Sequence, residues 1–121
     1  MRLYALRGAN SVERNEREEI LAATEEMMRE LMARNELEPA RLVSCLFTLT
    51  EDLDAEFPAV AARQLGLDQV PLMCAREVSV PGSMSRVIRV MVHCYAPEDH
   101  RPRHVYLRRA KALRADLDAA Q

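Results

Sequence analysis

An arginine inside an apolar segment is the residue of this chain most suited to chemistry. Arg89 lies in the stretch Val87 to Tyr95, where strand alternation puts it on the same face as His93. A guanidinium cannot lose its charge, and removing it from water costs on the order of several kcal/mol unless anionic or hydrogen-bonding groups surround it. Arg89 is therefore expected to bind an anion, supplied either by the protein or by a ligand.

Two other charged residues are candidates to share a site with Arg89. Glu77 is predicted to lie in the neighbouring strand, so a purely structural Arg89–Glu77 pair is one interpretation. The other interpretation adds Arg7, at the end of the first predicted strand. Two guanidiniums and one carboxylate would then form a concave site suited to a small dianion that also carries a hydroxyl. The residues alone leave both interpretations open.

The cysteines and histidines do not predict a metal centre. Cys45, Cys74 and Cys94 form no CxxC pair and lie in segments expected to be strands, so neither a disulfide framework nor a zinc site is indicated. His100 and His104 could share a helical face, but no acidic or cysteine partner stands at ligand spacing. We therefore expect no metal, and the odd number of cysteines fits a reducing compartment.

The size and composition of the chain are typical of one soluble domain. It has 121 residues, of which 49% are hydrophobic and 30% charged, so we expect a single domain over residues 1–121. Neither a spanning segment of roughly 20 apolar residues nor a signal peptide is apparent, which favours a cytoplasmic location. The net charge of -2 argues against general binding to nucleic acid or to membrane surfaces, so any anion must be met locally.

The N-terminal third predicts a strand followed by a long helix. Leu3 to Arg7 is expected to be a strand that closes in a turn at Gly8 to Asn10. Asn10 and Ser11 can cap a helix, and acidic residues crowd its first turns, which complements the helix dipole. Apolar residues at helical spacing, with methionines among them, continue to Arg34 and predict one apolar stripe packed on a sheet.

The rest of the chain predicts three more strands and a second helix. Arg41 to Thr50 indicates a buried strand, and a short helix is expected from Phe57 and Pro58 to Leu65, ended by Gly66. Val70 to Val78 and Arg86 to Tyr95 are predicted to be a hairpin joined at Pro81 to Ser83. The tail from His104 to Gln121 only partly matches a helix.

This β-α-β-α-β-β order predicts an α+β fold. We expect a mixed β-sheet with helices on one face, in which the second strand is joined to the first by a right-handed crossover.

Five groups of residues along the chain form a pattern together, although each group alone is weak. They are Arg7, Gly8, Ala9, Val12 and Glu13; Asp52, Leu53, Phe57, Pro58, Ala59 and Arg63; Val70, Pro71, Leu72, Cys74 and Glu77; Ile88, Arg89 and Val90; and His104, Val105, Tyr106, Leu107, Leu113, Arg114, Asp116 and Leu117. In this order and at these spacings they resemble the monofunctional chorismate mutases of the trimeric α/β-barrel class. The resemblance runs nearly from end to end.

The resemblance implies an assembly and a reaction. It implies a homotrimer whose mixed sheets form a pseudo-α/β-barrel, with active sites in the clefts between subunits. The implied substrate is chorismate, which such enzymes convert to prephenate in aromatic amino-acid biosynthesis. This Claisen rearrangement is unimolecular and pericyclic, so it requires no nucleophile, proton transfer, metal or cofactor.

The resemblance also implies roles for four residues. Arg89 resembles the arginine that faces the ether oxygen of the breaking bond, where a preorganised donor is worth about 3–4 kcal/mol. Arg7 and Tyr106 look like the pair that holds the carboxylate of the enolpyruvyl side chain and folds it over the ring. Glu77 resembles a group that contacts the ring hydroxyl, and it completes an expected catalytic set with Arg89 and Arg7.

Further residues are expected to contact the substrate around this centre. The segment around Cys74 resembles a second contact to the ring hydroxyl, and Phe57, Arg63 and Arg114 correspond to residues at the mouth or wall of the cleft. The whole expected substrate-binding set is Arg7, Phe57, Arg63, Met73, Cys74, Ala75, Arg76, Glu77, Arg89, Tyr106 and Arg114. Two positions depart from the family pattern and bear on cleft polarity: Met73 replaces a common small hydroxyl residue, and Val60 stands where a basic residue can occur.

Two rival functions are compatible with an arginine in a strand. One is the trimeric imine or enamine hydrolase family of similar architecture, which would need water activation. The other is a noncatalytic module that binds small anions at subunit interfaces, with Arg89 and Glu77 only structural. Loss of chorismate absorbance with prephenate as product distinguishes a mutase from both.

Overall fold

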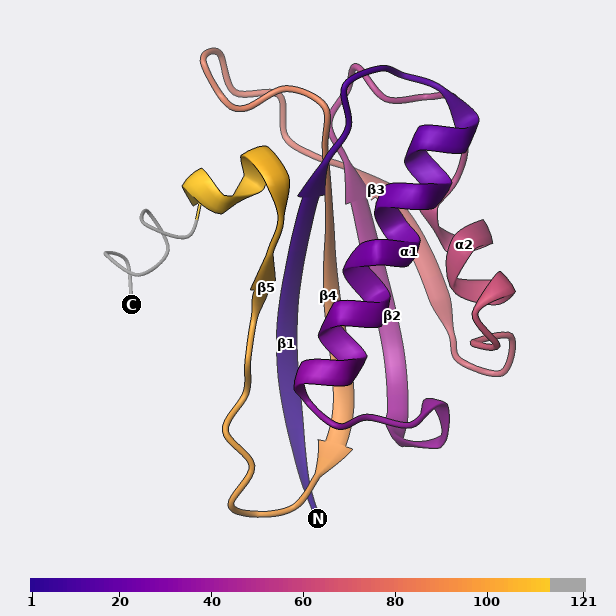
Figure 1. The fold of residues 1–121 in the computed structure, drawn as a ribbon, viewed down its shortest axis with the longest axis vertical. Coiled ribbons are helices and arrows are strands. Elements are labelled where there is room, and N and C mark those ends of the chain that lie inside the picture. The colour runs from indigo at the N-terminus through magenta and orange to yellow at the C-terminus, as the bar shows by residue number, and fades with distance from the viewer. Residues whose placement is uncertain (114–121) are drawn as a thin grey trace.

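The computed structural model describes residues 1–113, in which α helices cover one face of a mixed sheet (Figure 1). In chain order the elements are β1 (Arg2–Ser11), α1 (Arg17–Arg34), η1 (Pro39–Arg41), β2 (Leu42–Leu49), α2 (Pro58–Gln64), β3 (Leu72–Arg76), β4 (Val87–Ala96), β5 (Val105–Tyr106) and η2 (Arg108–Ala110), where η denotes a 3-10 helix. The strands and α helices through β4 follow the predicted β-α-β-α-β-β order, and the α+β fold class is confirmed.

Over residues 1–113 the sheet has five strands in the order β3-β2-β4-β1-β5. β4 pairs antiparallel with both β1 and β2, so β1 and β2 run parallel to each other, as predicted, with β4 between them. β3 and β5 are parallel additions at the two edges. The predicted hairpin is wrong, because β2 lies between β3 and β4. The turn signal itself is real, since Gly82 has a φ of 84°, but it lies in a long connection rather than between two paired strands.

The side of the sheet under α1 and α2 holds the hydrophobic core. Phe47 of β2 and Val92 of β4 are buried there with Met27 and Leu31 of α1, which confirms the predicted apolar stripe. α1 approaches β1 most closely at Gly8: a Cβ at this position would lie 3.0 Å from Val90 Cγ1. Glycine is therefore required here by packing.

The opposite side of the sheet, which we call the open face, carries alternate residues of the same strands. Its members include Arg7 of β1, Leu46 and Thr48 of β2, and Arg89 and Met91 of β4. The alternation predicted for β4 is confirmed, because the residues between these are buried. Within residues 1–113, no helix covers the open face (Figure 1).

The first strand is longer than the sequence predicted. Residues 8–10 do not turn but continue the pairing with β4 as far as Ser11, which lies opposite Val87. Asn10 cannot cap a helix from within the sheet. Its buried side chain instead donates hydrogen bonds to the carbonyl oxygen of Ala23 at 3.0 Å and to Glu26 Oε1 at 2.9 Å. β1 is thereby fastened to α1.

The first helix consequently begins later than predicted, at Arg17. Its N-cap residue is Glu16, which makes no side-chain capping hydrogen bond. Glu19 in the first turn accepts hydrogen bonds from the backbone amides of Glu13 and Arg14, at 3.1 and 3.3 Å. These bonds fix the loop that leads from the sheet into the helix.

The middle of the chain agrees more closely with the sequence. The predicted buried strand is β2 and the helix that follows is α2, which has Pro58 in its first turn. Gly66, with a φ of 92°, follows the helix end, where a residue without a Cβ tolerates the left-handed conformation. β3 is shorter than predicted and ends at Arg76, although the amide of Glu77 still donates to the carbonyl oxygen of Leu49.

The start of the predicted C-terminal helix is a strand instead. Val105 and Tyr106 pair with Gly8 and Ala9 of β1, and the amide of Leu107 donates to the carbonyl oxygen of Ala9 at 3.0 Å. η2 follows at once, and Arg114 lies outside the described residues. In the described part of the chain, the helices are too short or too polar to span a membrane.

Candidate active site

A hollow of about 320 Å³ lies on the open face, where the two predicted arginines come together. Arg7 of β1 and Arg89 of β4 line it, with Thr48 of β2 and Tyr106 of β5 on either side. Arg7 and Arg89 share this face because Arg7 pairs with Met91 and Ala9 pairs with Arg89 across an antiparallel ladder. The geometry of adjacent strands thus places two permanent positive charges in one concavity.

Arg89 has an anionic partner within the chain, as its position in a strand requires. Arg89 Nε donates to Glu77 Oε2 at 2.9 Å, and Thr48 Oγ1 donates to the same oxygen at 2.7 Å. The Glu77 side chain is only 15% exposed and that of Arg89 38%. Glu77 reaches Arg89 from beyond the end of β3 and across β2, not from a neighbouring strand of a hairpin. The Arg89–Glu77 contact was predicted, but from a hairpin pairing of their strands that does not exist.

The remaining nitrogens of Arg89 stay available to a ligand. Among the described residues, Nε is the only atom of this guanidinium with a partner. The Arg7 guanidinium makes no hydrogen bond in the described part of the chain. Glu77 binds Arg89 but does not itself line the hollow. Two guanidiniums against this one carboxylate leave a net positive charge there, which favours a small anion.

His104, to which the sequence assigned no role at the site, fixes the backbone at Arg7. The amide of Arg7 donates to Nδ1 of His104 at 3.0 Å, and His104 is the residue just before β5. Burial and the nearby Arg7 guanidinium both lower the pKa of His104. The neutral imidazole is thus the form that supports the β1–β5 junction, and its proton is assigned to Nε2 from this hydrogen bond.

Thr48 was also missed, although its signal was present in the sequence. Burial alternates along much of β2, with Cys45, Phe47 and Leu49 buried and Leu46 and Thr48 facing the hollow. The apolar character of the stretch suggested a strand buried on both faces. A hydroxyl at an alternate position was the available clue that one face is functional.

The other predicted substrate contacts do not gather at this hollow. Met73 and Ala75 share the open face with Leu46 and Thr48 but lie on the edge strand β3. Cys74 points the other way and packs against the core. Arg76 donates to the carbonyl oxygens of Thr50 and Leu53, at 2.7 Å each, so it supports the loop after β2.

Phe57 and Arg63 belong to the helical region at the same edge of the sheet. Phe57 is the N-cap residue of α2 and is exposed, and Arg63 lies in the last turn of this helix. Neither lines the hollow. Within residues 1–113, one chain therefore provides Arg7, Arg89, Glu77 and Tyr106 at one place and carries the edge residues at another.

Known proteins are similar to this chain over nearly its whole length. The family model for chorismate mutase type I matches residues 3–117. Chorismate mutase AroH of Thermus thermophilus is 49% identical over 119 residues, which cover 96% of this chain and 97% of that protein. Chorismate mutase AroH of Bacillus subtilis is 41% identical over 120 residues, or 97% of this chain and 94% of that protein. The solved structure of a chorismate mutase from Clostridium thermocellum matches with a TM-score of 0.88 at 44% identity and covers 90% of this chain and 98% of that chain.

Proposed function

The chain belongs to the chorismate mutase type I family and converts chorismate to prephenate, and we propose that the hollow on its open face is the active site. The observation that carries this proposal is that Arg7 and Arg89 line one hollow while Glu77 is paired with Arg89. Chorismate has two carboxylates and a ring hydroxyl, so this set of charges matches its polar groups.

Arg89 is assigned to the ether oxygen of the breaking bond. In the rearrangement the carbon–oxygen bond breaks while a carbon–carbon bond forms in the same molecule, and negative charge grows on that oxygen. A fixed donor aimed at a developing charge stabilises the transition state more than the ground state, by about 3–4 kcal/mol in comparable sites. The ion pair to Glu77 at 2.9 Å holds the guanidinium in place before the substrate arrives.

Glu77 is assigned a second task at the ring hydroxyl. Its Oε2 accepts from both Arg89 and Thr48, which fixes the carboxylate. The other carboxylate oxygen, Oε1, can accept a hydrogen bond from the ring hydroxyl, and no proton is transferred. This contact would set the orientation of the ring relative to Arg89.

Arg7 and Tyr106 are assigned to the carboxylate of the enolpyruvyl side chain. Both residues line the hollow from neighbouring strands at its β1–β5 side. Holding this carboxylate over the ring brings the two reacting carbons together, and conformational restraint of this kind can provide a large part of a rate enhancement. No general acid or base is required for this step.

We further propose that the working unit is a homotrimer in which a neighbouring subunit completes each site. Phe57, Arg63, Met73 and Cys74 belong to the β3–α2 edge and do not reach the hollow of their own chain. If that edge of one subunit closes the hollow of another, the two half-sets of expected contacts form one cleft, to which Arg114 would also contribute. Cys45, Cys74 and Cys94 are free thiols, which supports the proposal that the enzyme works in the cytoplasm.

Replacement of Arg89 tests the assignment directly. Arg89→Ala should lower kcat for chorismate by at least about a hundredfold, because the developing charge loses its donor. The assay is loss of chorismate absorbance, with prephenate identified as the product. Arg101→Ala, an exposed arginine that lines a separate hollow, is the matched control and should keep wild-type activity. Near-normal kcat in a folded Arg89→Ala protein would remove Arg89 from the mechanism.

A further inference from the structure

The segment that carries Tyr106 has little regular structure of its own to hold it. β5 is only two residues long, and among the described strands it pairs with β1 alone. η2 follows directly, and its first residue, Arg108, has a φ of 49°. A residue with a side chain is strained in this left-handed conformation and keeps it only when surrounding contacts impose it. The contacts of η2 should therefore decide where Tyr106 lies.

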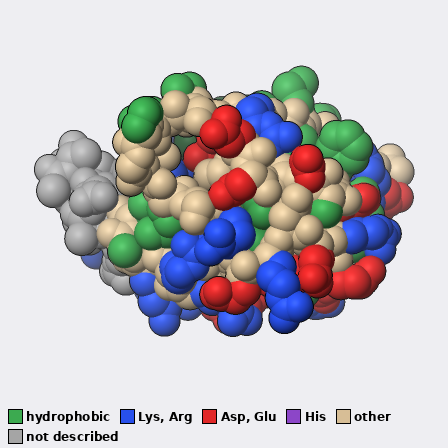
Figure 2. Space-filling model, turned by 90° about the horizontal axis from the view of Figure 1, so that it is seen from above, with side chains coloured by type: hydrophobic (Ala, Val, Ile, Leu, Met, Phe, Trp, Pro, Cys, Tyr) green, Lys and Arg blue, Asp and Glu red, His purple; other side chains and the backbone are tan. Residues whose placement is uncertain are grey.

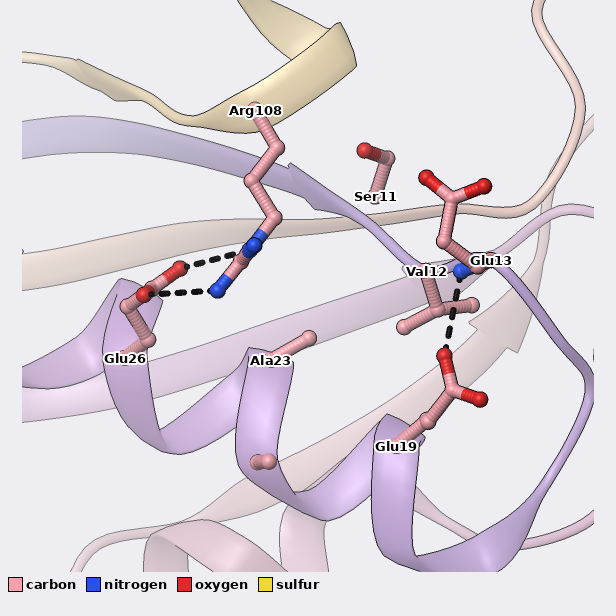
Figure 3. Close-up of a pocket in the computed structure, with 8 residues that line it drawn as sticks. Ser11, Val12, Glu13, Glu19, Ala23, Glu26 and Arg108 are labelled. Atoms are coloured by element: carbon pink, nitrogen blue, oxygen red, sulfur yellow. Dashed lines mark hydrogen bonds and ion pairs between the residues drawn. The ribbon is translucent and has the colours of Figure 1, made fainter.

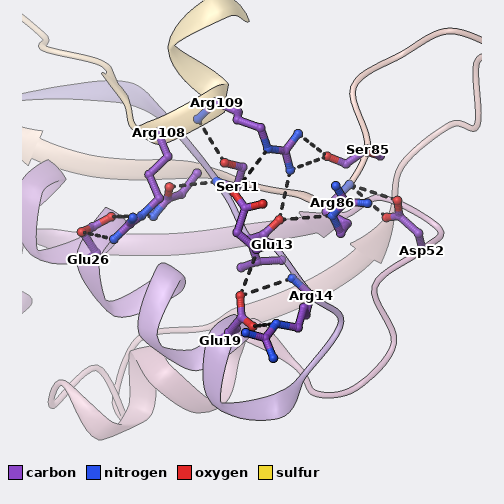
Figure 4. Close-up of polar contacts among 12 residues, drawn as sticks. Ser11, Glu13, Arg14, Glu19, Glu26, Asp52, Ser85, Arg86, Arg108 and Arg109 are labelled. Atoms are coloured by element: carbon purple, nitrogen blue, oxygen red, sulfur yellow. Dashed lines mark hydrogen bonds and ion pairs between the residues drawn. The ribbon is translucent and has the colours of Figure 1, made fainter.

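Arg109 makes the most extensive of these contacts (Figure 4). Both Nη atoms donate to the carbonyl oxygen of Ser85 at 3.1 Å, and Nη2 also donates to that of Val12 at 3.0 Å. The backbone amide of Arg109 donates to Ser11 Oγ at 3.1 Å. One residue thus joins η2 to the end of β1 and to the segment that leads into β4.

The segment held at Ser85 is connected to the site at both of its ends. It begins after Glu77 and ends where β4 starts, two residues before Arg89. At its close, Arg86 has a φ of 51°, and its amide donates to both carboxylate oxygens of Asp52 at 3.1 and 3.0 Å. Arg109 therefore contacts segments at the ends of β1, β4 and β5. These three strands carry Arg7, Arg89 and Tyr106.

Arg108 provides a second attachment in a different direction (Figure 3). Its Nε and Nη2 donate to the two carboxylate oxygens of Glu26 on α1, at 3.2 Å each. Glu26 Oε1 also accepts from the buried side chain of Asn10 at 2.9 Å. This pair is largely exposed, and acidic and basic side chains are intermingled over this end of the molecule (Figure 2). Exposed ion pairs of this kind contribute little to stability by themselves, so Arg108 is the weaker of the two attachments.

We propose that Arg109 is a positioning residue that holds Tyr106 against Arg7 for the rearrangement of chorismate. The proposal rests on the role proposed above for Tyr106. The Arg109 side chain is only 34% exposed, and its guanidinium donates to backbone carbonyls. Backbone acceptors are fixed in place, whereas the side chains of an exposed ion pair can move. Arg109 Nε is buried without a hydrogen-bond partner among the described residues, and Glu13 Oε1 lies 4.0 Å from it. The guanidinium is thus fixed by the Ser85 and Val12 carbonyls.

Replacing the donors of Arg109 should affect substrate binding more than the chemical step. Arg109→Met keeps the length of the side chain and should raise KM for chorismate by about tenfold or more, with a smaller change in kcat, because small displacements of a binding group have large effects. Arg109→Lys keeps one charged donor and should fall between Met and the wild type, and it serves if the Met variant does not fold. Arg101→Met, with its exposed and distant side chain, is the matched control and should be normal. Wild-type KM in a folded Arg109→Met protein would overturn the proposal.

A double variant distinguishes positioning from general stability. If Arg109 acts through Tyr106, Arg109→Met should add little to the KM increase already caused by Tyr106→Phe. Equal fold-changes in the two backgrounds would reject the coupling. A merely structural role would lower the melting temperature and the active fraction while leaving KM unchanged.

One readout is independent of the proposed roles in catalysis. The Leu107 amide, which donates to the carbonyl oxygen of Ala9, should exchange its hydrogen faster in Arg109→Met than in the wild type. If Tyr106→Phe leaves KM unchanged, the proposed role of Tyr106 fails. Faster exchange at Leu107 would still support the attachment by Arg109, and unchanged exchange would reject it.

Discussion

At the scale of single residues, the two interpretations of Arg89 turn out to be compatible. The structural pair with Glu77 exists, and its arginine lines the same hollow as Arg7. A charge at a site for an anion must already be oriented before the anion arrives, since reorientation during the reaction would weaken its effect. The Arg89–Glu77 ion pair therefore satisfies the structural interpretation and also orients Arg89 as the catalytic interpretation requires.

Mild acid is expected to weaken the support that His104 gives to Arg7. The neutral imidazole accepts the Arg7 amide, and the pKa of His104 is lowered by burial and by the Arg7 guanidinium. The unfolded chain therefore binds this proton at a higher pH than the folded one. The stability that neutral His104 contributes is complete above about pH 6.5, its ordinary pKa, and is lost as the pH falls through the lowered value.

The variant His104→Asn isolates this effect, because it keeps an acceptor that cannot titrate. Its free energy of unfolding should change less between about pH 7 and about pH 5 than that of the wild type, as measured by denaturant titration. The two proteins share every other titratable group, so the difference reports His104. Equal pH dependence in the two proteins would show that the imidazole does not titrate differently on folding.

The centre of the site could be predicted from the sequence, but its periphery could not be assembled. Arg89 follows from strand alternation and the cost of an unpaired buried charge, and Arg7 was added from its place in the first predicted strand and from the resemblance. Glu77 was expected in a neighbouring strand, whereas it bridges across β2 through Thr48. Phe57 and Arg63 were predicted from the resemblance alone, and the fold of one chain does not bring them to the hollow.

At the scale of elements, the contact between α1 and β1 limits which residue can stand at position 8. A Cβ there would lie 3.0 Å from Val90 Cγ1 and 3.1 Å from Met27 Cγ. Val90 is β-branched and stiff, so it cannot yield easily. Gly8→Ala should lower the free energy of unfolding by about 1–3 kcal/mol, the usual effect of overpacking a core. Denaturant titration at fixed protein concentration measures this change.

Gly82 offers a control with the opposite properties. It has a φ of 84°, and a Cβ there would meet no atom of the described residues within 4 Å. Asparagine tolerates the left-handed conformation better than other residues with side chains, so Gly82→Asn should cost less than about 1 kcal/mol. A Gly8→Ala protein as stable as Gly82→Asn would show that α1 can move away from β1.

The errors in predicting the elements share one physical cause, which is that pairing partners are distant in sequence. Gly8 and Asn10 are turn-forming residues by local preference, but pairing with β4 keeps them in β1. The Pro81–Ser83 turn suggested a hairpin because neighbouring strands often pair. β5 was missed because two residues carry no periodicity, and only the β1 edge makes them a strand. Long local patterns, such as that of α1, were predicted correctly.

At the scale of the whole molecule, the sheet has one face buried by helices and one face that carries both the charges and exposed apolar residues. On the open face, Leu46 is 41% exposed and Met73, its neighbour on β3, is 63% exposed. Contiguous exposed apolar residues commonly mark an interface. The same surface therefore serves the proposed trimer and the proposed site, so assembly and activity should be linked.

Leu46→Glu should test this link, because a carboxylate placed in an apolar interface loses its hydration without gaining a partner. We expect the mass from light scattering to fall from trimer to monomer, and the activity per chain to rise with protein concentration as the trimer re-forms. Ala22→Glu adds the same charge on the exposed side of α1 and should leave both mass and activity unchanged. Since Leu46 also lines the hollow, mass is the decisive readout. A wild-type protein that is monomeric and fully active when dilute would contradict a site shared between subunits.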